Sequence, residues 1–485
     1  MGDIGQRGGR SSAEADHEVQ PDLRARAGTF LVNRDFARLW YGQAISTVGD
    51  FVFDTTLTIW VATQLFARSH WAPAAVSGLM LCALAAIILV GPVAGVFVDR
   101  WSRRRTMLAS EVIRGLLVGL LTLVTLLPRD ALPASVWLII LYGVVFVVNA
   151  AGQFFNPARF ATVGEIVADE ADRAKAVGLG QATAATAAVV GPPLAAPLLF
   201  TLGIQWALLI NALSYAVSFF AVRSVHFPMA AVARATGEAA RKQAWRVEFA
   251  AGVKMFTGNR FLVALLTVAV ISSLGVGAVT PLLVFFMSDN LHTSTRLLGL
   301  MTMAYGLGSV AGSLVSGRAA RLVGARNLTW LGLLATGCLL SVYARQTDFT
   351  AALVLMFLMA IPVAALNAGL SPLLMAVTPK DFMGRMIAVF TPVNMAASVG
   401  SVVIAGCLAS TVLAGFHATV AGRLHVGRID TIYTVSACLI VASGIYGCVA
   451  LPRSSSKLGD DLAGGVPVAT LTGQPGTVGA TESSE

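Results

Sequence analysis

Two aspartates lie within an otherwise apolar segment near the start of the chain. Asp50 and Asp54 belong to a polar series with successive spacings of 4, 3, 4 and 4 residues, whose other members are Gln43, Thr47 and Thr58. Helical periodicity places this series on one stripe of a helix. If the helix begins near residue 41, a rise of 1.5 Å per residue puts the two carboxyl groups about 14 and 20 Å along it. Acids at such depth in lipid predict a polar cavity and a role in binding protons or substrate.

Shorter polar stripes occur in other apolar segments. Asn149, Gln153 and Asn156 form one, Asn367 and Ser371 a second, and the third consists of Thr391, Asn394, Ser398 and Ser401. We predict that these stripes face an aqueous or substrate cavity rather than lipid. Hydrogen bonds between helices are the alternative for the Asn and Ser residues. The predicted cavity residues are Gln43, Thr47, Asn149, Gln153, Asn367 and Asn394.

A dense group of charges follows the apolar run that ends near residue 98. The segment from Gly95 to Arg105 reads GVFVDRWSRRR and contains Asp99, Arg100, Arg103 and Arg104. Glu111 and Arg114 follow, three residues apart, so they share a face of the next helix and extend this charged group. The alternative is a local ion pair that serves only to solvate both charges.

The elements that position these residues are membrane-spanning helices. The 485 residues are 56% hydrophobic and 12% charged, with a mean hydropathy of +0.76, which exceeds what a water-soluble core of this size can bury. Stretches without acidic or basic residues are about one span long, and the 47 uncharged residues from 176 to 222 hold two spans with a turn near Gly203. We predict an all-α polytopic membrane protein with twelve transmembrane helices.

Basic residues predict the orientation of these spans. With the N-terminus inside, 27 of the 34 Lys and Arg residues lie in inner segments and six in outer loops. Basic loops resist translocation, so both termini are predicted to be cytoplasmic in a multi-pass protein of the cell membrane. The net charge of +9 therefore reflects topology, and a nucleic-acid partner is not expected.

The spans divide into two groups of six. We predict a disordered tail over 1–38, a six-helix half over 39–223, a cytoplasmic loop over 224–258, a second half over 259–452 and a disordered tail over 453–485. Gly317 lies 222 positions after Gly95, and GRAARLVGAR follows span 8 as GVFVDRWSRR follows span 2. Two matching halves that rock against each other are typical of transporters.

These residues resemble a known family. Gly95, Asp99, Arg100, Arg103 and Arg104 resemble motif A of the major facilitator superfamily, with Ser102 in place of a glycine. The flanking motifs resemble the drug-exporter branch that includes macrolide efflux proteins and the enterobactin exporter; they are Asn33–Trp40, Gly42-Gln43, Gly49-Asp50, Asn156–Arg159 and Gly384-Arg385.

The resemblance implies a major facilitator fold and roles for particular residues. Asp99 is expected to accept hydrogen bonds from the start of span 11 and so to close an inner gate. Gly191 and Pro192 resemble the core of an antiporter motif, although alanines replace its other glycines. The predicted gating residues are Gly95, Asp99, Arg100, Arg103, Arg104, Glu111, Arg114, Gly191 and Pro192.

Proton coupling is predicted to rest on the acids of span 1. A carboxyl group in a dry cavity favours its neutral form and releases its proton when water or a cation reaches it. Asp50 is the preferred coupling group because the Gly49-Asp50 step is shared with the family, which leaves Asp54 to contact cationic substrates. The alternative is that both acids only bind cationic drugs.

The predicted function is secondary active efflux of amphipathic or apolar, drug-like molecules by proton antiport with alternating access. No G-x-x-x-x-G-K-[ST] motif is present, the six histidines form no metal set, and no catalytic grouping is seen, so we expect no enzyme activity, metal or cofactor beyond the proton gradient. We expect a monomer in the lipid bilayer. The alternatives are a siderophore or lysophospholipid transporter of the same fold, or a membrane sensor or enzyme that does not transport.

Overall fold

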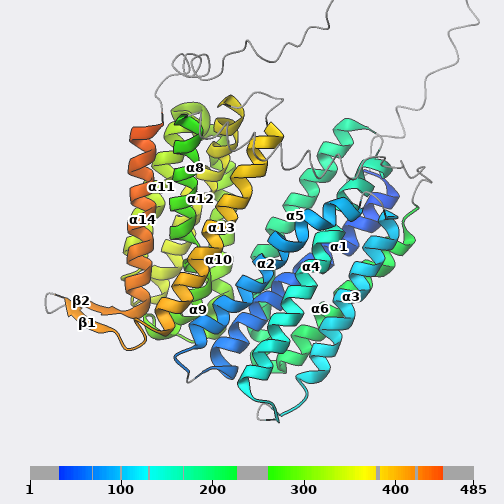
Figure 1. Ribbon diagram of the computed structural model, residues 1–485, viewed down its shortest axis with the longest axis horizontal. Helices are drawn as coiled ribbons and strands as arrows, with labels where there is room; N and C mark the ends of the chain where they lie inside the picture. Colours follow the sequence, from blue (N-terminus) through cyan, green and yellow to red (C-terminus); the bar gives the residue numbers. More distant parts are fainter. Residues whose placement is uncertain are drawn as a thin grey trace, which may run out of the picture.

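Two helical bundles, one from each half of the sequence, make up the computed structural model (Figure 1). It describes residues 32–67, 69–98, 101–128, 131–167, 169–226, 260–377, 383–420 and 424–451. The predicted tails and most of the predicted cytoplasmic loop lie outside these residues. The described chain begins and ends at one end of both bundles, which we call the tail side; the opposite end is the far side.

The N-terminal half contains six spans that alternate in direction. Their bounds are α1 Arg34–Trp60 continued by the π-helix η1 Val61–Leu65, α2 Ala72–Val98, α3 Arg103–Val124, α4 Ala134–Ile166, α5 Glu170–Pro197 continued by η3 Leu198–Leu202, and α6 Ile204–Ser224.

The C-terminal half repeats this order with one broken span. Its elements are α8 Arg260–Val276, α9 Val279–Asp289, the 3₁₀ turn η4 Thr295–Leu297, α10 Leu298–Val323, α11 Ala325–Tyr343, α12 Phe349–Val377, α13 Met383–Ser410 and α14 Arg428–Ala450.

The predicted twelve-helix fold in two halves is confirmed. Within the described residues, ten helical segments are long and apolar enough to cross a membrane by themselves, with α8 and α9 together forming one. The other two spans are α11 and α1, which carries five charged residues. The predicted turn between spans 5 and 6 is also confirmed, because η3 ends at Leu202 and α6 begins at Ile204. Gly203 joins them with φ of 98°, a conformation that favours glycine.

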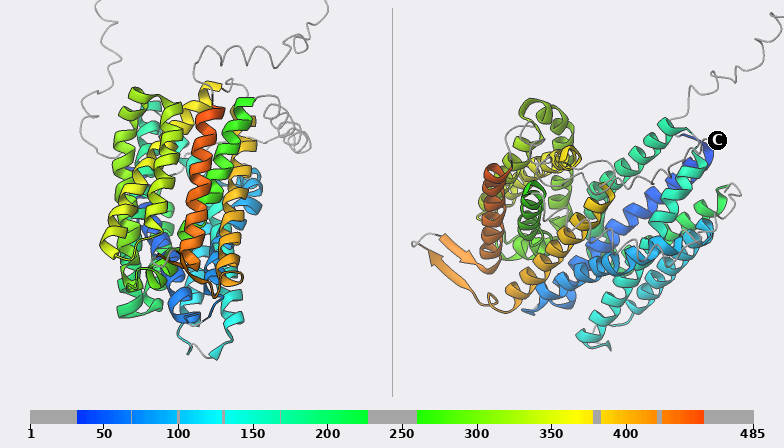
Figure 2. Two further views of the ribbon diagram at one scale, coloured as in Figure 1. Left: turned by 90° about the vertical axis from the view of Figure 1, so that its left-hand side faces the viewer. Right: turned by 45° about the horizontal axis from the view of Figure 1, so that its top comes forward.

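One element was not predicted from the sequence. The loop between α13 and α14 contains the antiparallel strands β1 His417–Val420 and β2 Leu424–Gly427, with Thr419 opposite His425. This hairpin projects from the far side of the C-terminal half (Figure 2). The β-branched residues Thr419, Val420 and Val426 favour extended backbone, a local signal that is weak beside the long apolar runs.

Small residues permit the close helix contacts within each half. A Cβ on Gly312 of α10 would lie 2.6 Å from the carbonyl oxygen of Ile361 on α12, and one on Gly308 would meet Phe357. Gly308 and Gly312 form a G-x-x-x-G motif, which is typical of close helix packing in membranes. Gly42 and Gly49 of α1 serve the same purpose against α6.

Arginines on the tail side cap the last helix of each half. Arg104, at the start of α3, donates from Nη2 to the carbonyl of Arg223 at the end of α6, at 2.8 Å. Arg326, 222 positions later at the start of α11, donates to the carbonyls of Cys448 and Leu451 at the end of α14, at 2.5 and 2.7 Å. The two halves thus use corresponding residues of the sequence repeat for the same helix-capping contact.

The halves meet toward the far side and separate toward the tail side (Figure 1). In α10, a Cβ on Gly299 would clash with Pro193 of α5, and one on Gly306 would lie 2.5 Å from Val189. In the second contact, the backbone N–H of Ala74 on α2 donates to Ser410 Oγ on α13 at 3.0 Å. A Cβ on Gly95 or Gly317, near the tail-side ends of α2 and α10, would instead have no described neighbour within 4 Å.

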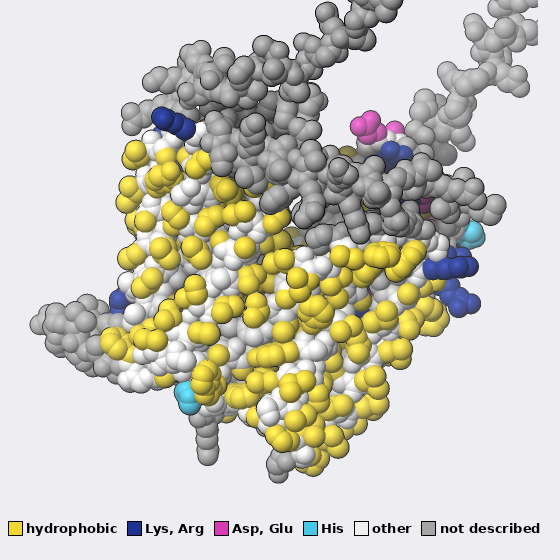
Figure 3. All heavy atoms as spheres, in the orientation of Figure 1, with side chains coloured by type: hydrophobic (Ala, Val, Ile, Leu, Met, Phe, Trp, Pro, Cys, Tyr) yellow, Lys and Arg dark blue, Asp and Glu magenta, His cyan; other side chains and the backbone are white. Residues whose placement is uncertain are grey.

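The outer surface is suited to lipid. Hydrophobic side chains cover much of the face of both bundles seen in Figure 3, and the Lys and Arg side chains visible there lie mainly near the tail-side margin. Large exposed apolar residues on these faces include Leu116, Ile139, Leu314 and Val449. Apolar surface of this extent requires lipid as its solvent.

Candidate transport site

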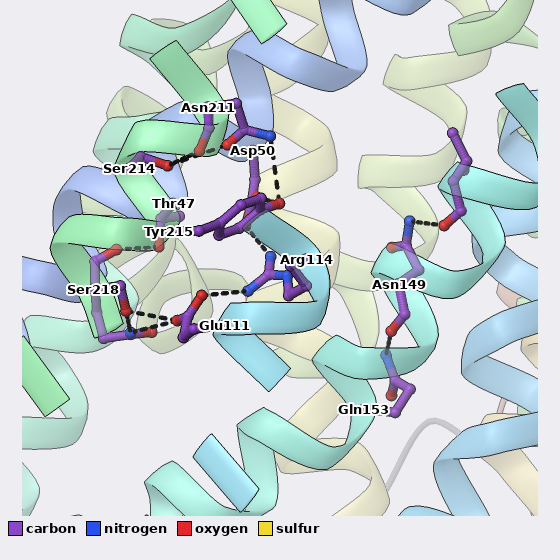
Figure 4. A network of polar contacts seen from close by, with 12 residues as sticks. Thr47, Asp50, Glu111, Arg114, Asn149, Gln153, Asn211, Ser214, Tyr215 and Ser218 are labelled. Atoms are coloured by element: carbon purple, nitrogen blue, oxygen red, sulfur yellow. Dashed lines mark hydrogen bonds and ion pairs between the residues drawn. The ribbon is translucent and has the colours of Figure 1, made fainter. Parts of the chain in front are cut away.

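A buried ionic contact joins α1, α3 and α6 inside the N-terminal half. Arg114 of α3 donates from Nη2 to Asp50 Oδ2 of α1 at 2.7 Å. The hydroxyl of Tyr215 on α6 donates to the other oxygen of the same carboxylate at 2.5 Å. The Arg114 guanidinium also lies over the Tyr215 ring, 4.2 Å from its centroid. Asp50 is therefore held from two neighbouring helices (Figure 4).

A second carboxyl group lies next to this contact. Glu111 of α3 has a fully buried side chain, and its Oε1 accepts a hydrogen bond of 2.6 Å from Ser218 Oγ on α6. Gln43 Nε2 of α1 donates to Ser218 Oγ at 2.6 Å and lies 3.4 Å from Glu111 Oε1. Glu111 Oε2 is 3.8 Å from Arg114 Nη1, and no described residue forms a hydrogen bond with it. We call Gln43, Asp50, Glu111, Arg114, Tyr215 and Ser218 the polar junction.

Burial makes the charges of the polar junction energetically important. The side chain of Arg114 is 11% exposed and that of Asp50 34%, against 0% for Glu111. Moving a charge out of water is costly unless a partner compensates it, and removal of one partner leaves the other uncompensated. One guanidinium therefore lies between two carboxyl groups. Binding or release of one proton changes the net charge of the polar junction.

A glycine on α1 brings the polar junction together. A Cβ on Gly49 would lie 2.5 Å from Ser214 Oγ and 2.7 Å from Asn211 Oδ1, both on α6. Asn211 in turn donates to the Tyr215 hydroxyl at 3.4 Å. Without a side chain at Gly49, the two helices approach closely enough for Asp50 and Tyr215 to bond.

Asp54 lies in a different environment, one turn farther along α1. It lines a cavity of about 430 Å³ between the two halves, and among the described residues of the cavity lining it is the one that carries a charge. The remaining wall is apolar, with hydroxyl groups from Thr58, Thr280 and Tyr305 among others. Flexible Met80, Met356 and Met359 side chains also line it. This cavity can accommodate an apolar molecule that carries one cationic group.

The other predicted cavity residues are dispersed. Thr47 donates to the carbonyl of Gln43 in its own helix at 2.7 Å. Asn149 and Gln153 bond along α4, apart from the polar junction (Figure 4). Asn394 of α13 accepts a hydrogen bond of 2.5 Å from Ser273 of α8, and Asn367 is exposed on α12. Gln43 faces α3 and α6 in the polar junction.

The predicted gating residues also fall into separate places. Asp99 and Arg100 lie outside the described residues. Arg103 pairs with Glu165 of α4 and also contacts a backbone carbonyl of α4, and Arg104 contacts a carbonyl at the end of α6. A Cβ on Gly95 would meet no described atom within 4 Å. Gly191 packs α5 on α1, since its Cβ would lie 2.5 Å from Phe51 Cβ. Pro192 lines the cavity and lies beside Gly299 of the other half.

The structure thus groups the charged residues differently from the sequence prediction. Asp50 and Asp54 were placed together in the cavity, with Glu111 and Arg114 at the gate. The packing of α3 on α1 and α6 instead joins Asp50 to Glu111 and Arg114. Tyr215 and Ser218 were not among the predicted site residues. A polar series on α6, at positions 211, 214, 215 and 218, is the signal that indicates them.

A metal centre finds no support in the described part of the chain. There, no three His, Cys, Asp or Glu side chains lie close enough together to hold a metal ion. The cysteines in these ranges are free thiols.

Comparison with known proteins gives matches over both halves. The family model described as Major Facilitator Superfamily matches residues 39–271 and 265–473. A relative named "Putative bacilysin exporter BacE" from Bacillus subtilis (strain 168) is 30% identical over 190 residues, which are 39% of this chain and 43% of BacE. Macrolide efflux protein A from Streptococcus pyogenes is 23% identical over 193 residues, 40% of this chain and 45% of that protein. These matches cover less than half the length of either relative.

A solved structure shares the whole fold. The crystal structure of a bacterial homologue of the iron transporter ferroportin, in an inward-facing state, superimposes with a TM-score of 0.64 at 14% identity. The likeness covers 87% of this chain and 99% of that one.

Proposed function

The chain belongs to the Major Facilitator Superfamily, and we propose that it is a secondary active exporter that exchanges amphipathic small molecules for protons. Family and fold identify a transporter rather than an enzyme. Export is the direction named for BacE and for macrolide efflux protein A. If the tail side is cytoplasmic, the halves are separated on the side from which an exporter takes up its substrate.

The cavity at Asp54 is the observation that carries the substrate class. Its wall is mainly apolar, so an apolar body gains free energy by leaving water. A single carboxylate in such a wall favours a cationic group, because a desolvated charge requires a partner. We therefore propose lipophilic monovalent cations as the preferred substrates, with Asp54 as their counter-ion.

The polar junction is the proposed coupling site. It contains a buried acid, Glu111, a largely buried arginine, Arg114, and the partly exposed Asp50, which lies on the same helix as Asp54. A proton that binds there changes the charge balance between α1, α3 and α6. This gives the proton gradient a means of acting on the helix that contacts substrate.

Accumulation of fluorescent lipophilic cations in cells tests the proposal. Cells that express the protein are expected to accumulate less dye than cells without it, and a protonophore is expected to abolish the difference. Asp54→Asn is expected to weaken export of cations by about tenfold or more while a neutral amphipath is less affected. Thr58→Ala changes the same cavity wall without removing charge and serves as the control. Equal accumulation of every compound with and without the parent protein contradicts the proposal.

A further inference from the structure

The two acids of the polar junction have unequal surroundings. Asp50 receives a charge-assisted bond from Arg114 at 2.7 Å and a short bond from the Tyr215 hydroxyl at 2.5 Å, one on each oxygen. Both bonds stabilise the ionised carboxylate. Asp50 thus has the partners that a permanent anion needs.

Glu111 has fewer partners and less access to water. Its side chain is 0% exposed, and within the described residues only Oε1 accepts hydrogen bonds, from Ser218 and at longer range from Gln43. Oε2 is buried and has no hydrogen-bond partner in the described part of the chain, since Arg114 Nη1 at 3.8 Å is too distant to donate to it. An ionised carboxylate in this position is costly, whereas a neutral carboxylic acid is not.

The ionisable groups around Glu111 come from three helices. Arg114 lies on its own helix, Asp50 faces it from α1, and the Tyr215 hydroxyl lies beside Asp50 on α6. The fourth helix packed here, α4, carries Arg159 and Glu165, and Glu165 pairs with Arg103 near the helix ends. With Asp50 ionised and Arg114 charged, the junction is neutral only when Glu111 holds a proton.

We propose that Glu111, rather than Asp50, binds the proton that is exchanged for substrate. This inference rests on the proposed proton antiport and identifies the proton-binding residue within its coupling site. When Glu111 loses its proton, the new carboxylate attracts Arg114, which weakens the bond from Arg114 to Asp50. Asp50 lies one turn from Asp54 on α1, so the change reaches the helix that lines the cavity. Each cycle moves one proton in and one substrate cation out.

The hydrogen-bonded neighbours of Glu111 give the proton a route. Ser218 and Gln43 lie nearer than Asp50 and Tyr215 to the tail-side ends of their helices. They are linked to each other and to Glu111 by hydrogen bonds of 2.6 Å. When the Ser218 hydroxyl turns so that it accepts from Glu111 instead of donating to it, a proton on Glu111 can leave toward the side on which the halves are separated.

Infrared spectroscopy of isotope-labelled protein tests this assignment without a substitution. The full chain is made by cell-free synthesis with ¹³C-labelled glutamate or ¹³C-labelled aspartate and reconstituted in lipid. At neutral pH we expect a carbonyl stretch of a buried, protonated carboxylic acid that shifts with labelled glutamate and not with labelled aspartate. Glu111 is the glutamate farthest from a helix end in the described residues, since Glu165 and Glu170 lie at helix termini. A band that shifts only with labelled aspartate overturns the proposal.

Transport by variants supplies the second measurement. In liposomes, Glu111→Gln is expected to lose proton-driven uphill efflux and to retain downhill substrate exchange, and the infrared band is expected to disappear. Glu165→Gln, which alters the glutamate paired with Arg103, is expected to keep both the band and uphill efflux. Uphill efflux by Glu111→Gln at the parent rate overturns the inference. If the parent transports no cation uphill but retains the glutamate band, the proposed function fails and the assignment of the proton to Glu111 remains.

Discussion

The two halves cross their first and sixth helices in the same way but place different chemistry at the crossing. In the N-terminal half, Gly49 of α1 faces Asn211 and Ser214 of α6. In the C-terminal half, Gly275 of α8, 226 positions later, faces Ile440 of α14. A Cβ on Gly275 would lie 2.5 Å from the Ile440 side chain. Both glycines permit the same close approach. The residue after the glycine is Asp50 in the first half and Val276 in the second.

The third helix of each half extends this comparison. Gly115 of α3 lies against α6, and Gly337 of α11, 222 positions later, lies against α14. The first junction contains the ionic contacts of Asp50, Glu111 and Arg114. Within the described residues of the second half, charged side chains occur near helix ends, and the same three spans enclose an aromatic cluster of Phe286, Tyr343 and Tyr433.

The two halves therefore share a packing frame, by which we mean the glycines that set how closely the helices approach. They differ in the side chains that lie between those helices. Glycines at corresponding positions set helix approach in both halves, whether polar or apolar groups fill the space between them. A proton can therefore change the interactions of one half while the other keeps its packing. We expect the N-terminal half to respond to pH and the C-terminal half to act as its rigid partner.

Replacement of Arg114 by Gln is expected to have the largest effect. It leaves Asp50 and Glu111 without their shared cation, and loss of one member of a buried ionic contact typically costs about 3–5 kcal/mol. We expect loss of uphill efflux together with a lower unfolding temperature in detergent. Adding Asp50→Asn to Arg114→Gln removes the uncompensated carboxylate and is expected to restore part of the stability. A single variant as stable and active as the parent would show that the junction contributes nothing.

Substitution of the two crossing glycines tests whether the packing frame is shared. Gly49→Val and Gly275→Val are each expected to destabilise by about 1–3 kcal/mol, because the new side chain enters occupied space. Only Gly49→Val is expected to alter the pH dependence of transport as well, since it separates Asp50 from Tyr215. Gly119→Ala on α3 is the control, because its Cβ would meet no described atom within 4 Å. Equal pH profiles in both valine variants contradict the comparison.

The capping arginines provide a test in which the expected loss of stability is smaller and equal in the two halves. Arg104→Gln and Arg326→Gln remove corresponding bonds to the ends of α6 and α14, and each is expected to cost about 1 kcal/mol. The pH dependence of transport is expected to stay unchanged in both. Thermal unfolding and labelling of single cysteines near these ends measure the effect. A change in membrane orientation without a change in stability would instead assign these arginines to topology alone.

The smallest effect is expected in the aromatic cluster. The Tyr343 hydroxyl is buried and no described residue bonds to it, so Tyr343→Phe is expected to change stability by less than about 1 kcal/mol and to leave transport at the parent rate. Tyr433 donates to the carbonyl of Val279 at 2.8 Å, and Tyr433→Phe is expected to cost about 1 kcal/mol. A pH-dependent defect in either variant would show that the second half also takes part in coupling.

The sequence predicts the fold well because lipid imposes a strong and local constraint. Ten of the twelve spans show as apolar runs of sufficient length in the described residues, and Gly203 indicates the turn between α5 and α6 within one residue. The repeat is also visible, from Gly95 and Gly317 to the pair Arg104 and Arg326. The hairpin after α13 is not predicted from apolar runs because its short strands lie outside them.

The partners of the charged residues were less predictable. Periodicity places Asp50 and Asp54 on one stripe, but it does not say which neighbouring helix supplies a polar group at each depth. Arg114 and Tyr215 lie level with Asp50, whereas Asp54, one turn farther, faces the cavity. That information depends on how α3 and α6 pack against α1, and one sequence contains no direct record of it.

The far-side closure between the halves has a consequence for the medium in which the protein works. In the described residues, no pair of opposite charges joins one half to the other; the contacts include glycines packed against backbone and side chains of the other half, the bond from Ala74 to Ser410, and Arg296 over the ring of Phe200. Ionic screening weakens exposed charge pairs far more than it weakens apolar contacts. As far as these contacts determine it, opening of this side is therefore expected to depend little on salt concentration, in fresh water as in brine.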